Sequence, residues 1–582
     1  MAQSGRGGHR VLWSLLVVGI VLGAAAWLGL NWLSAYRSAE AFRTEITGLQ
    51  ASTTARDWAA VTASVPRARE ASRTLAEATE HPTWRLLQDL PVVGANATAV
   101  SELAVAASAL LTAAEPLTPY AQRIVDGEVR RPDGSIDLTM AVDVAPLMSR
   151  LAVVIDHEAD RLSRIDASAL RPEVAEPLQQ LRDELAGAAP AVSTAADLVT
   201  RVPALLGEDG ERRWLVLLQN PAEARGTGGF PGAYVTLAAR DGAISVVSAG
   251  KSDDLNARPI PSGRAPEDSR LLWGDFLTQW NTFNLSPHFP LTVQLAAAGM
   301  AARGKPVDGV LAVDPRTVAA MLEVTGPVTA GGQTLTAENA ERFFTIDSYA
   351  TIPDQTERDR VTIELVGAVL QAFLSASWDP VLLADALTEP IAQGRMRVWS
   401  ADSAEQEWLV TTPVGGAVPN GKGSVVAVAF NNAAGNKMDA FVATSIDYQP
   451  GRCATSPTQQ SELAITLRND APLDLPLESG NYSRADDPTA PEGSTKLLMH
   501  VYAPVDAVFG SATMDGQPLE LFLGEEQGRP VWWTYVTLDR GQERAVVIDF
   551  EEPTVLGVEP TVLPQAMVID EVVSVRPVTD CA

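Results

Sequence analysis

An uncharged run over residues 11–36 constrains this chain more than any other feature. Its 26 residues would rise about 39 Å as a helix, more than the ~30 Å hydrocarbon core of a bilayer. Arg6 and Arg10 precede the run, and positively charged flanks favour the cytoplasmic side. We therefore predict a single-pass protein of the cell membrane. It has a cytoplasmic arm over residues 1–10, a transmembrane helix over 11–36 and an extracytoplasmic remainder.

The same run leaves a second interpretation open. The small residues of "GAAAW" could serve as a cleavage site, so that the run would be a signal peptide. The apolar sequence continues well past Ala26, which favours a retained anchor. Under both interpretations, most of the chain is exported.

Export also bears on the cysteines. The sequence contains two, Cys453 and Cys581, and no Cys-x-x-Cys motif. In an oxidising compartment an even number of cysteines favours a disulfide. We predict that Cys453 and Cys581 are joined, with two unrelated thiols as the alternative.

Length and charge limit the classes of protein to which the chain can belong. A chain of 582 residues is too long for one hydrophobic core, so several domains are expected. The formal net charge is −28 at pH 7. Because phosphate binding needs basic surface, this charge argues against a nucleic-acid partner.

Residues 38–205 have a helical pattern. Leu147, Leu151, Val154 and Leu162 recur at the spacing of one helix face, and alanine is abundant. Amphipathic helices rich in alanine usually serve packing alone. We predict a helical stalk or bundle here, without a cofactor site.

Residues 211–449 mix strands with helices. Apolar strand runs cover 213–220, 232–239 and 243–250, and "DG" between the last two predicts a hairpin. Helical periodicity returns, around a strand at 307–314, in four segments: 290–302, 315–324, 336–345 and 358–377. This order predicts a layered α/β domain. We expect the runs 424–432 and 439–448 to close its sheet as a further hairpin.

Residues 450–582 alternate apolar and polar side chains with period two, and turns separate the runs. This pattern predicts a C-terminal antiparallel β-sandwich. Trp532 and Trp533 must point to opposite faces of one strand. We expect one of them in the core and the other at a surface or contact.

No familiar catalytic motif is present: the sequence has no Walker motif, GxSxG elbow, HExxH or EF-hand loop. Polar residues instead gather in three segments of the α/β region, "EARGTGGF", "SAGKSDDLNAR" and "DSYATIPDQTERDRV". Arginine forks suit phosphate groups, and glycines let backbone amides approach an anion. The candidate ligand-binding residues are Glu223, Arg225, Lys251, Asp253, Asp254, Arg358 and Arg360. Asp253, Asp254 and Asp354 could hold Mg²⁺ beside a phosphate, and the pair Asp253 and Asp254 is the predicted metal site.

The order of these segments over residues 213–377 resembles the LytR-CpsA-Psr domain of membrane-anchored cell-envelope phosphotransferases. "WLVLLQNPAEARGTGGFPGAYVTL" resembles that domain's first hairpin, and "ISVVSAGKSDD" resembles its second segment. "VDGVLAVDPRTVAAMLEVTGPVTAGGQTLTAENAERFF" is the most similar stretch, and "DQTERDRVTIELVGAVLQAFL" resembles the entry into its long helix. "AEARGTGGF", "FNNAAGNKMD" and "LRNDAP" are also typical of an uncharacterised bacterial family of anchored proteins, a domain of unknown function.

The resemblance implies an activity. LytR-CpsA-Psr enzymes transfer a glycopolymer from a polyprenyl-pyrophosphate carrier to peptidoglycan, using arginines for the pyrophosphate and an aspartate-bound Mg²⁺. By position, Arg225, Arg358 and Arg360 would bind the anion. Asp253 or Asp254 would match the acidic end of the second segment.

The sequence departs from that family at two places. Thr227 stands where the family has an Asp after its first Arg, and Lys251 and Ser252 stand where it has an Arg. Loss of a carboxylate removes a metal ligand, which leaves catalysis open. We therefore expect an envelope protein that binds, and in its enzymatic form transfers, a polyprenyl-pyrophosphate-linked glycan, with peptidoglycan as a second partner. The alternative is a non-catalytic envelope scaffold whose charged clusters are structural ion pairs.

Overall fold

The computed structural model describes most of the chain after the N-terminal region. The described residues are 33–55, 57–91, 93–375, 378–451, 456–473, 482–555 and 557–576. The predicted cytoplasmic arm, nearly all of the predicted transmembrane helix, and Cys453 and Cys581 lie outside them. The described residues form two compact units. The first contains those up to 211 with 240–243 and 378–385, and the second contains those in 212–239, 244–376 and 386–582.

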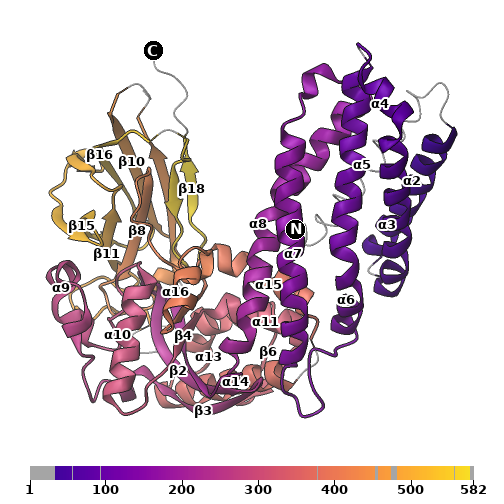
Figure 1. Cartoon of the computed structure of the whole chain (residues 1–582). Coiled ribbons are helices and arrows are strands. Elements are labelled where there is room, and N and C mark those ends of the chain that lie inside the picture. The colour runs from indigo at the N-terminus through magenta and orange to yellow at the C-terminus, as the bar shows by residue number, and fades with distance from the viewer. Residues whose placement is uncertain are drawn as a thin grey trace. The chain divides into compact units, whose positions relative to one another are not determined.

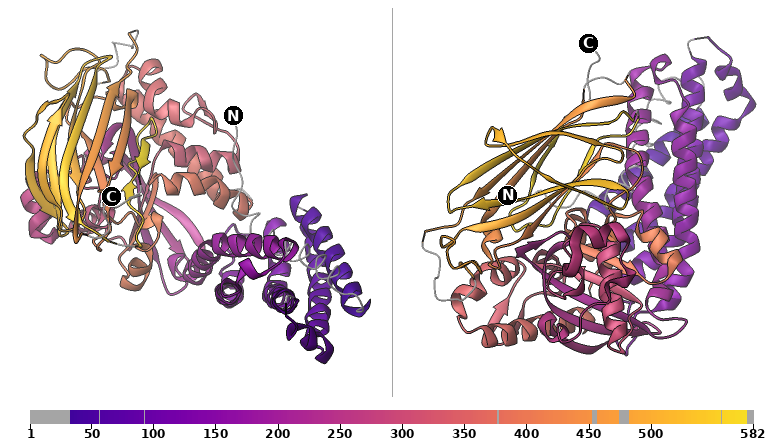
Figure 2. Two further views of the ribbon diagram at one scale, coloured as in Figure 1. Left: turned by 90° about the horizontal axis from the view of Figure 1, so that it is seen from above. Right: turned by 90° about the vertical axis from the view of Figure 1, so that its left-hand side faces the viewer.

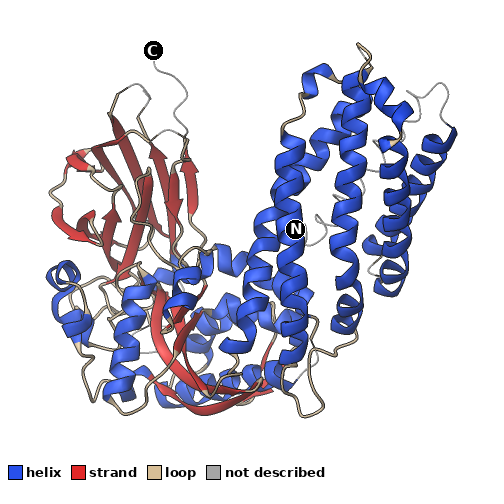
Figure 3. Ribbon diagram, in the orientation of Figure 1, coloured by secondary structure: helices blue, strands red, loops and turns tan. Residues whose placement is uncertain are grey.

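The first unit consists almost entirely of helices (Figure 3). They are α2 (Leu33–Thr54), α3 (Trp58–Glu80), α4 (Pro82–Gln88), α5 (Gly94–Ala114), α6 (Thr118–Val125), α7 (Leu138–Ser163) and α8 (Pro172–Leu205) (Figure 1). The Asp137 side chain caps α7 by accepting a hydrogen bond from the Thr139 N–H, and Pro172 begins α8. Leu151 of α7 and Leu181 of α8 belong to one buried core. The predicted helical N-terminal part is therefore confirmed.

Two segments of this unit could span a membrane by length and composition alone, Gly94–Ile124 and Leu138–Ser163. Both also bury leucines in the core of the unit, such as Leu103 and Leu151. Core helices of soluble proteins meet the same criterion, so these segments are weak evidence for membrane association.

The second unit begins with a mixed five-stranded sheet in the order β3-β2-β1-β4-β7. The strands are β1 (Arg212–Arg225), β2 (Gly228–Arg240), β3 (Ala243–Lys251), β4 (Gly309–Val313) and β7 (Met396–Ser400). Strand β1 runs antiparallel to β2 and parallel to β4. Asp241 and Gly242 form the predicted turn between β2 and β3, both with positive φ (48° and 80°).

Helices cover both faces of this sheet, because residues of β1 alternate between two cores. Leu215 and Leu217 belong to the core that contains Phe289 and Leu295 of α10 (Phe289–Ala302). On the other face, Val216 packs in a cluster with residues of α14 (Gln355–Ser375). The mixed α/β middle of the chain is thus confirmed.

Shorter elements complete the α/β part. They include the 3₁₀ turn Ser252–Leu255, α9 (Glu267–Trp273), α11 (Pro315–Thr325), β5 (Val328–Ala330), β6 (Gln333–Leu335), α12 (Ala340–Arg342), the π-helical turn Phe343–Asp347, α13 (Ser348–Thr351), α15 (Pro380–Ala392) and α16 (Ser403–Leu409).

The C-terminal part is a sandwich of two sheets that lie face to face (Figure 2). One sheet contains β13 (Gln517–Pro518), β12 (Val508–Met514), β16 (Glu543–Pro553), β10 (Thr458–Asn469), β9 (Val442–Gln449) and β18 (Val572–Val575). The other contains β14 (Phe522–Glu526), β15 (Arg529–Leu538), β11 (Thr495–Tyr502), β8 (Val425–Asn432) and β17 (Thr561–Leu563). The predicted strand-rich C-terminal region is confirmed.

The tryptophan pair divides as expected. Trp532 is buried in the sandwich core. Trp533 lies on the opposite face of the same sheet, packed against the core of the α/β part. Its ring stacks on Phe522, with ring centroids 4.2 Å apart.

The prediction that residues 424–432 and 439–448 close the α/β sheet is wrong. Both form strands, but β8 pairs with β11 and β9 pairs with β10, inside the sandwich. A period-two pattern fits any sheet that is buried on one face, so it does not specify the partner strand. Phe430 of β8 points into the sandwich core, and the sandwich therefore begins at β8.

Candidate functional site

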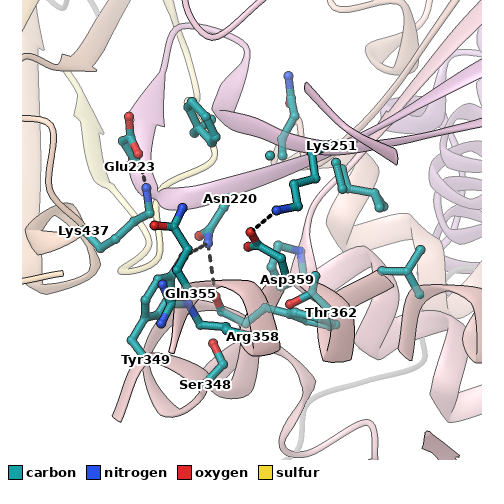
Figure 4. A pocket seen from close by; sticks show the side chains of 18 of the residues that line it. Asn220, Glu223, Lys251, Ser348, Tyr349, Gln355, Arg358, Asp359, Thr362 and Lys437 are labelled. Carbon is teal, nitrogen blue, oxygen red and sulfur yellow. Dashed lines mark hydrogen bonds and ion pairs between the residues drawn. The ribbon is translucent and has the colours of Figure 1, made fainter. Parts of the chain in front are cut away.

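A cavity of about 430 Å³ lies where β1, β2 and β4 meet α14 and two loops of the sandwich (Figure 4). Leu218, Asn220 and Glu223 of β1 form one wall. The start of α14 forms another, and Lys251 and Asp253 border the cavity after β3.

Helix geometry decides which side chains of α14 reach this cavity. Asp354 caps the helix, because its Oδ1 accepts a hydrogen bond from the Glu357 N–H at 2.8 Å. Lining residues follow at the spacing of one helix face: Gln355, Arg358, Asp359, Thr362, Ile363 and Val366. Arg360 is not on this face; it is exposed and pairs with Glu357 and Glu364.

Part of the cavity wall is apolar. The apolar lining residues are Leu218, Phe230, Val313, Val318, Phe344, Ile363 and Val366. Leu218, Val313 and Val366 belong to the hydrophobic cluster between the sheet and α14. This wall can accept a hydrocarbon chain but offers it no hydrogen bond.

Among the described residues at this site, Arg358 is the cation without a carboxylate partner. Its Nη1 donates a hydrogen bond to the Ile352 carbonyl at 2.9 Å. Its guanidinium carbon lies 4.6 Å from the centre of the Tyr349 ring. Within the part of the chain that the structure describes, Arg358 forms no ion pair. Its remaining N–H groups are the donors that an anion at this edge would meet first.

Lys251 already has a partner. It forms an ion pair with Asp359 across the cavity edge (Figure 4). The hydrogen bond to Asp359 raises the pKa of Lys251 above its usual value. Lys251 therefore stays protonated, but an anionic ligand would have to share it with Asp359.

Glu223 and Arg225 form a buried network with Lys437 of the sandwich. Arg225 Nη2 donates to Glu223 Oε1 at 2.6 Å, and Lys437 pairs with the other carboxylate oxygen. Burial alone would raise the pKa of Glu223, but Lys437 and Arg225 lower it to about 2. The Arg225 fork also donates to the carbonyls of Ala224 and Asn281, so protein atoms already hold it.

The glycines of the turn serve close packing of the backbone. A Cβ at Gly226 would lie 2.1 Å from the Leu285 carbonyl oxygen, and a Cβ at Gly229 would lie 2.2 Å from the Asn220 carbonyl carbon. The Gly226 N–H donates to Asn431 Oδ1 of β8 at 2.8 Å. This amide has a protein partner and does not face a ligand.

The structure therefore divides the candidate residues into two groups. Four of them line the cavity: Glu223, Lys251, Asp253 and Arg358. Three do not: Arg225, Asp254 and Arg360. Asp254 accepts a hydrogen bond from the backbone N–H of Lys251 at 3.3 Å and belongs to its own turn.

The predicted pair of Mg²⁺ ligands does not meet at the cavity, since only Asp253 lines it. Across the described ranges, no group of three or more His, Cys, Asp and Glu side chains is arranged to hold a metal ion. A Mg²⁺ ion bound through phosphate oxygens and water needs only one or two protein carboxylates. Asp253 could supply one.

Sequence reasoning missed several cavity residues. The clearest are Asn220, Tyr349, Asp359 and Lys437. Asn220 Nδ2 donates to Tyr349 Oη at 3.2 Å, which joins β1 to α13. Lys437 lies in "FNNAAGNKMD", where a charged residue follows an apolar strand, and that signal could have marked it.

In the comparison with known proteins, one segment of the chain matches a family model. Residues 209–349 match the model of the family described as Protein of unknown function (DUF4012). The match begins just before β1 and ends at Tyr349 in α13, so Arg358 and Lys437 lie outside it. The chain matches no curated protein. This segment thus resembles a domain of unknown function, as the sequence motifs suggested.

Proposed function

We propose that this chain is a membrane-anchored, extracytoplasmic envelope protein that binds a polyprenyl-pyrophosphate-linked glycan in the cavity. The observation that carries the proposal is the position of Arg358, a cation without an ion-pair partner among the described residues, beside an apolar wall. A ligand that suits both features has an anionic group joined to a hydrocarbon chain. The polyprenyl pyrophosphate implied by the LytR-CpsA-Psr resemblance has this character.

Two cations support the placement of the anion. Arg358 offers free guanidinium donors, and Lys251 lies at the same cavity. Asp253 would hold Mg²⁺ together with phosphate oxygens of the ligand. Transfer of the glycan to peptidoglycan is the enzymatic form of the proposal and requires this metal.

Calorimetry of the full-length chain in detergent with undecaprenyl pyrophosphate tests the binding step. Titrations with and without Mg²⁺ should both show binding, and the affinity should be higher with Mg²⁺. Absence of binding in both would end the proposal. Transfer is tested separately, by incubation with the lipid-linked glycan and peptidoglycan fragments and mass spectrometry of the products.

A non-catalytic envelope scaffold is the second candidate. It is favoured by the buried Glu223–Arg225 pair, which joins the α/β part to the sandwich through Lys437. A scaffold would bind no polyprenyl pyrophosphate, and it would retain its partners when Arg358 is replaced. Co-purification from the envelope with wild-type and Arg358→Gln chains distinguishes the two candidates.

The proposed location has its own test. A cysteine placed at exposed Ser403, in a chain lacking Cys453 and Cys581, should react in intact cells with a thiol probe that cannot cross membranes. Labelling only after lysis would contradict the proposed topology. Mass spectrometry of non-reduced peptides from the natural chain should find Cys453 joined to Cys581, and two free thiols would contradict the disulfide.

A further inference from the structure

The sandwich contributes its own wall to the cavity. Gly435, Lys437, Tyr482 and Asp486 line the cavity, and all four come from two loops, 433–438 and 482–486, called here the sandwich loops. The Lys437 N–H donates to the Tyr482 carbonyl at 2.9 Å, and the Asp486 N–H donates to the Ala434 carbonyl at 2.7 Å. These two backbone hydrogen bonds fasten the loops to each other.

Close contacts fix the side chains of this wall. Gly435 has a φ of 72°, and a Cβ there would lie 2.1 Å from Asp486 Oδ2. The Tyr482 ring stacks on Tyr349, with ring centroids 4.9 Å apart and an interplanar angle of 19°. Lys437 is held by Glu223. The wall is therefore organised before any ligand binds, which lowers the entropic cost of binding.

The chemistry of this wall differs from that around Arg358. The exposed carboxylate of Asp486 would repel a phosphate group. The Tyr482 hydroxyl is buried and has no hydrogen-bond partner among the described residues. A buried hydroxyl without a partner is unfavourable, so a ligand group that pairs with it gains affinity. A carboxylate, a phenol and an ammonium group together suit neutral hydroxyl groups better than an anion.

We propose that the sandwich loops form a subsite for the first sugar attached to the pyrophosphate. Tyr482, Lys437 and Asp486 hydrogen-bond its hydroxyl groups, while the pyrophosphate lies at Arg358 and the hydrocarbon chain lies against the apolar wall. This inference rests on the proposed function and adds the orientation of the ligand and the residues that select its sugar.

Two probes that differ only in the sugar test the subsite. The affinity of the full-length chain is measured for undecaprenyl pyrophosphate and for the same lipid carrying one N-acetylglucosamine. Wild type should bind the sugar-bearing lipid more tightly. Asp486→Asn and Tyr482→Phe should each weaken binding of the sugar-bearing lipid by about 3–10-fold, the scale of one hydrogen bond, and neither should weaken binding of the bare lipid.

Matched controls come from the same sandwich. Asp506 is exposed in a turn with a φ of 64°, a conformation that Asn adopts as readily, and it does not line the cavity. Tyr535 is exposed on β15, away from the cavity lining. Asp506→Asn and Tyr535→Phe should leave both affinities unchanged. Since the Tyr482 hydroxyl has no partner among the described residues, Tyr482→Phe should unfold at or above the wild-type temperature.

Three outcomes would overturn the subsite. If wild type binds both lipids equally, the proposed function stands and the sugar subsite fails. If the variants weaken the binding of both lipids equally, the sandwich loops contact the pyrophosphate and not the sugar. If wild type binds neither lipid, the proposed function fails and the subsite fails with it.

Discussion

Two segments of the second unit carry an arginine beside a carboxylate, and the structure uses them in different ways. In the turn 223–229, Arg225 is 4% exposed and pairs with Glu223. At the start of α14, Arg358 is partly exposed beside the cavity and pairs with no carboxylate that the structure describes. An arginine thus forms part of the buried interior in one segment and is available to a ligand in the other.

The difference arises from what surrounds each segment. The end of β1 is covered by the sandwich, since Asn431 binds the Gly226 N–H and Gln565 binds the Arg225 carbonyl. Every charge placed there needs a protein partner, because an unpaired buried charge is very unfavourable. Helix α14 has one face at the cavity, so Arg358 can remain without such a partner. A charged side chain without an ion-pair partner therefore indicates a candidate site better than a sequence rich in charged residues does.

The largest effect that tests this contrast is expected from Arg225→Ala, which should lower the stability of the second unit. It leaves the buried Glu223 with Lys437 alone and removes the donors of two carbonyl groups. We expect the free energy of unfolding of the second unit to fall by about 3–5 kcal/mol, the usual cost of breaking a buried pair. Scanning calorimetry measures it. A variant that unfolds at the wild-type temperature would show that Arg225 is not structural.

The second expected effect concerns acid stability. The neighbours Lys437 and Arg225 outweigh burial and lower the pKa of Glu223 from 4.5 to about 2. Since the unfolded chain binds this proton more tightly, the stabilisation is complete above about pH 4.5 and is lost as the pH falls through 2. Between pH 5 and 2, wild type should lose ~3 kcal/mol more than Glu223→Gln. Parallel stability curves for the two proteins would contradict this origin.

These contrasts also show how much of the molecule the sequence determines. Periodicity predicted the helices of the first unit, the hairpin at Asp241 and the strands of the sandwich, because local burial patterns produce these features. It could not predict that β8 pairs with β11, because strand pairing depends on contacts between distant residues.

The candidate site was predictable to a similar degree. The clusters around Lys251 and Arg358 do meet at one cavity. The role of Arg225 could not be predicted, because Asn431 and Gln565, which cover it, lie more than 200 residues away along the chain. Lys437 was missed for the same reason, since its partner Glu223 is 214 residues distant.

A third prediction addresses the exposed segment. Arg358→Gln removes the charge and the guanidinium, whose Nη1 donates to the Ile352 carbonyl. We expect affinity for undecaprenyl pyrophosphate to fall about 10–100-fold, the scale of a hydrogen bond to a charged group. The unfolding temperature should change little, because Arg358 pairs with no carboxylate among the described residues and so leaves no buried charge unpaired. A large loss of stability without loss of affinity would make Arg358 the structural residue and remove the contrast with Arg225.

The smallest expected effect comes from Arg360, which provides the matched control. It lies two residues from Arg358 on the same helix and carries the same charge, but it is exposed, pairs with Glu357 and Glu364, and does not line the cavity. Exposed pairs of this kind contribute little to stability, because water and salt screen them. Arg360→Gln should therefore leave the unfolding temperature close to that of wild type and lipid affinity within about twofold of wild type. If Arg360→Gln weakened binding as much as Arg358→Gln, the helix would act through its overall positive charge. The position of Arg358 at the cavity would then have no special role.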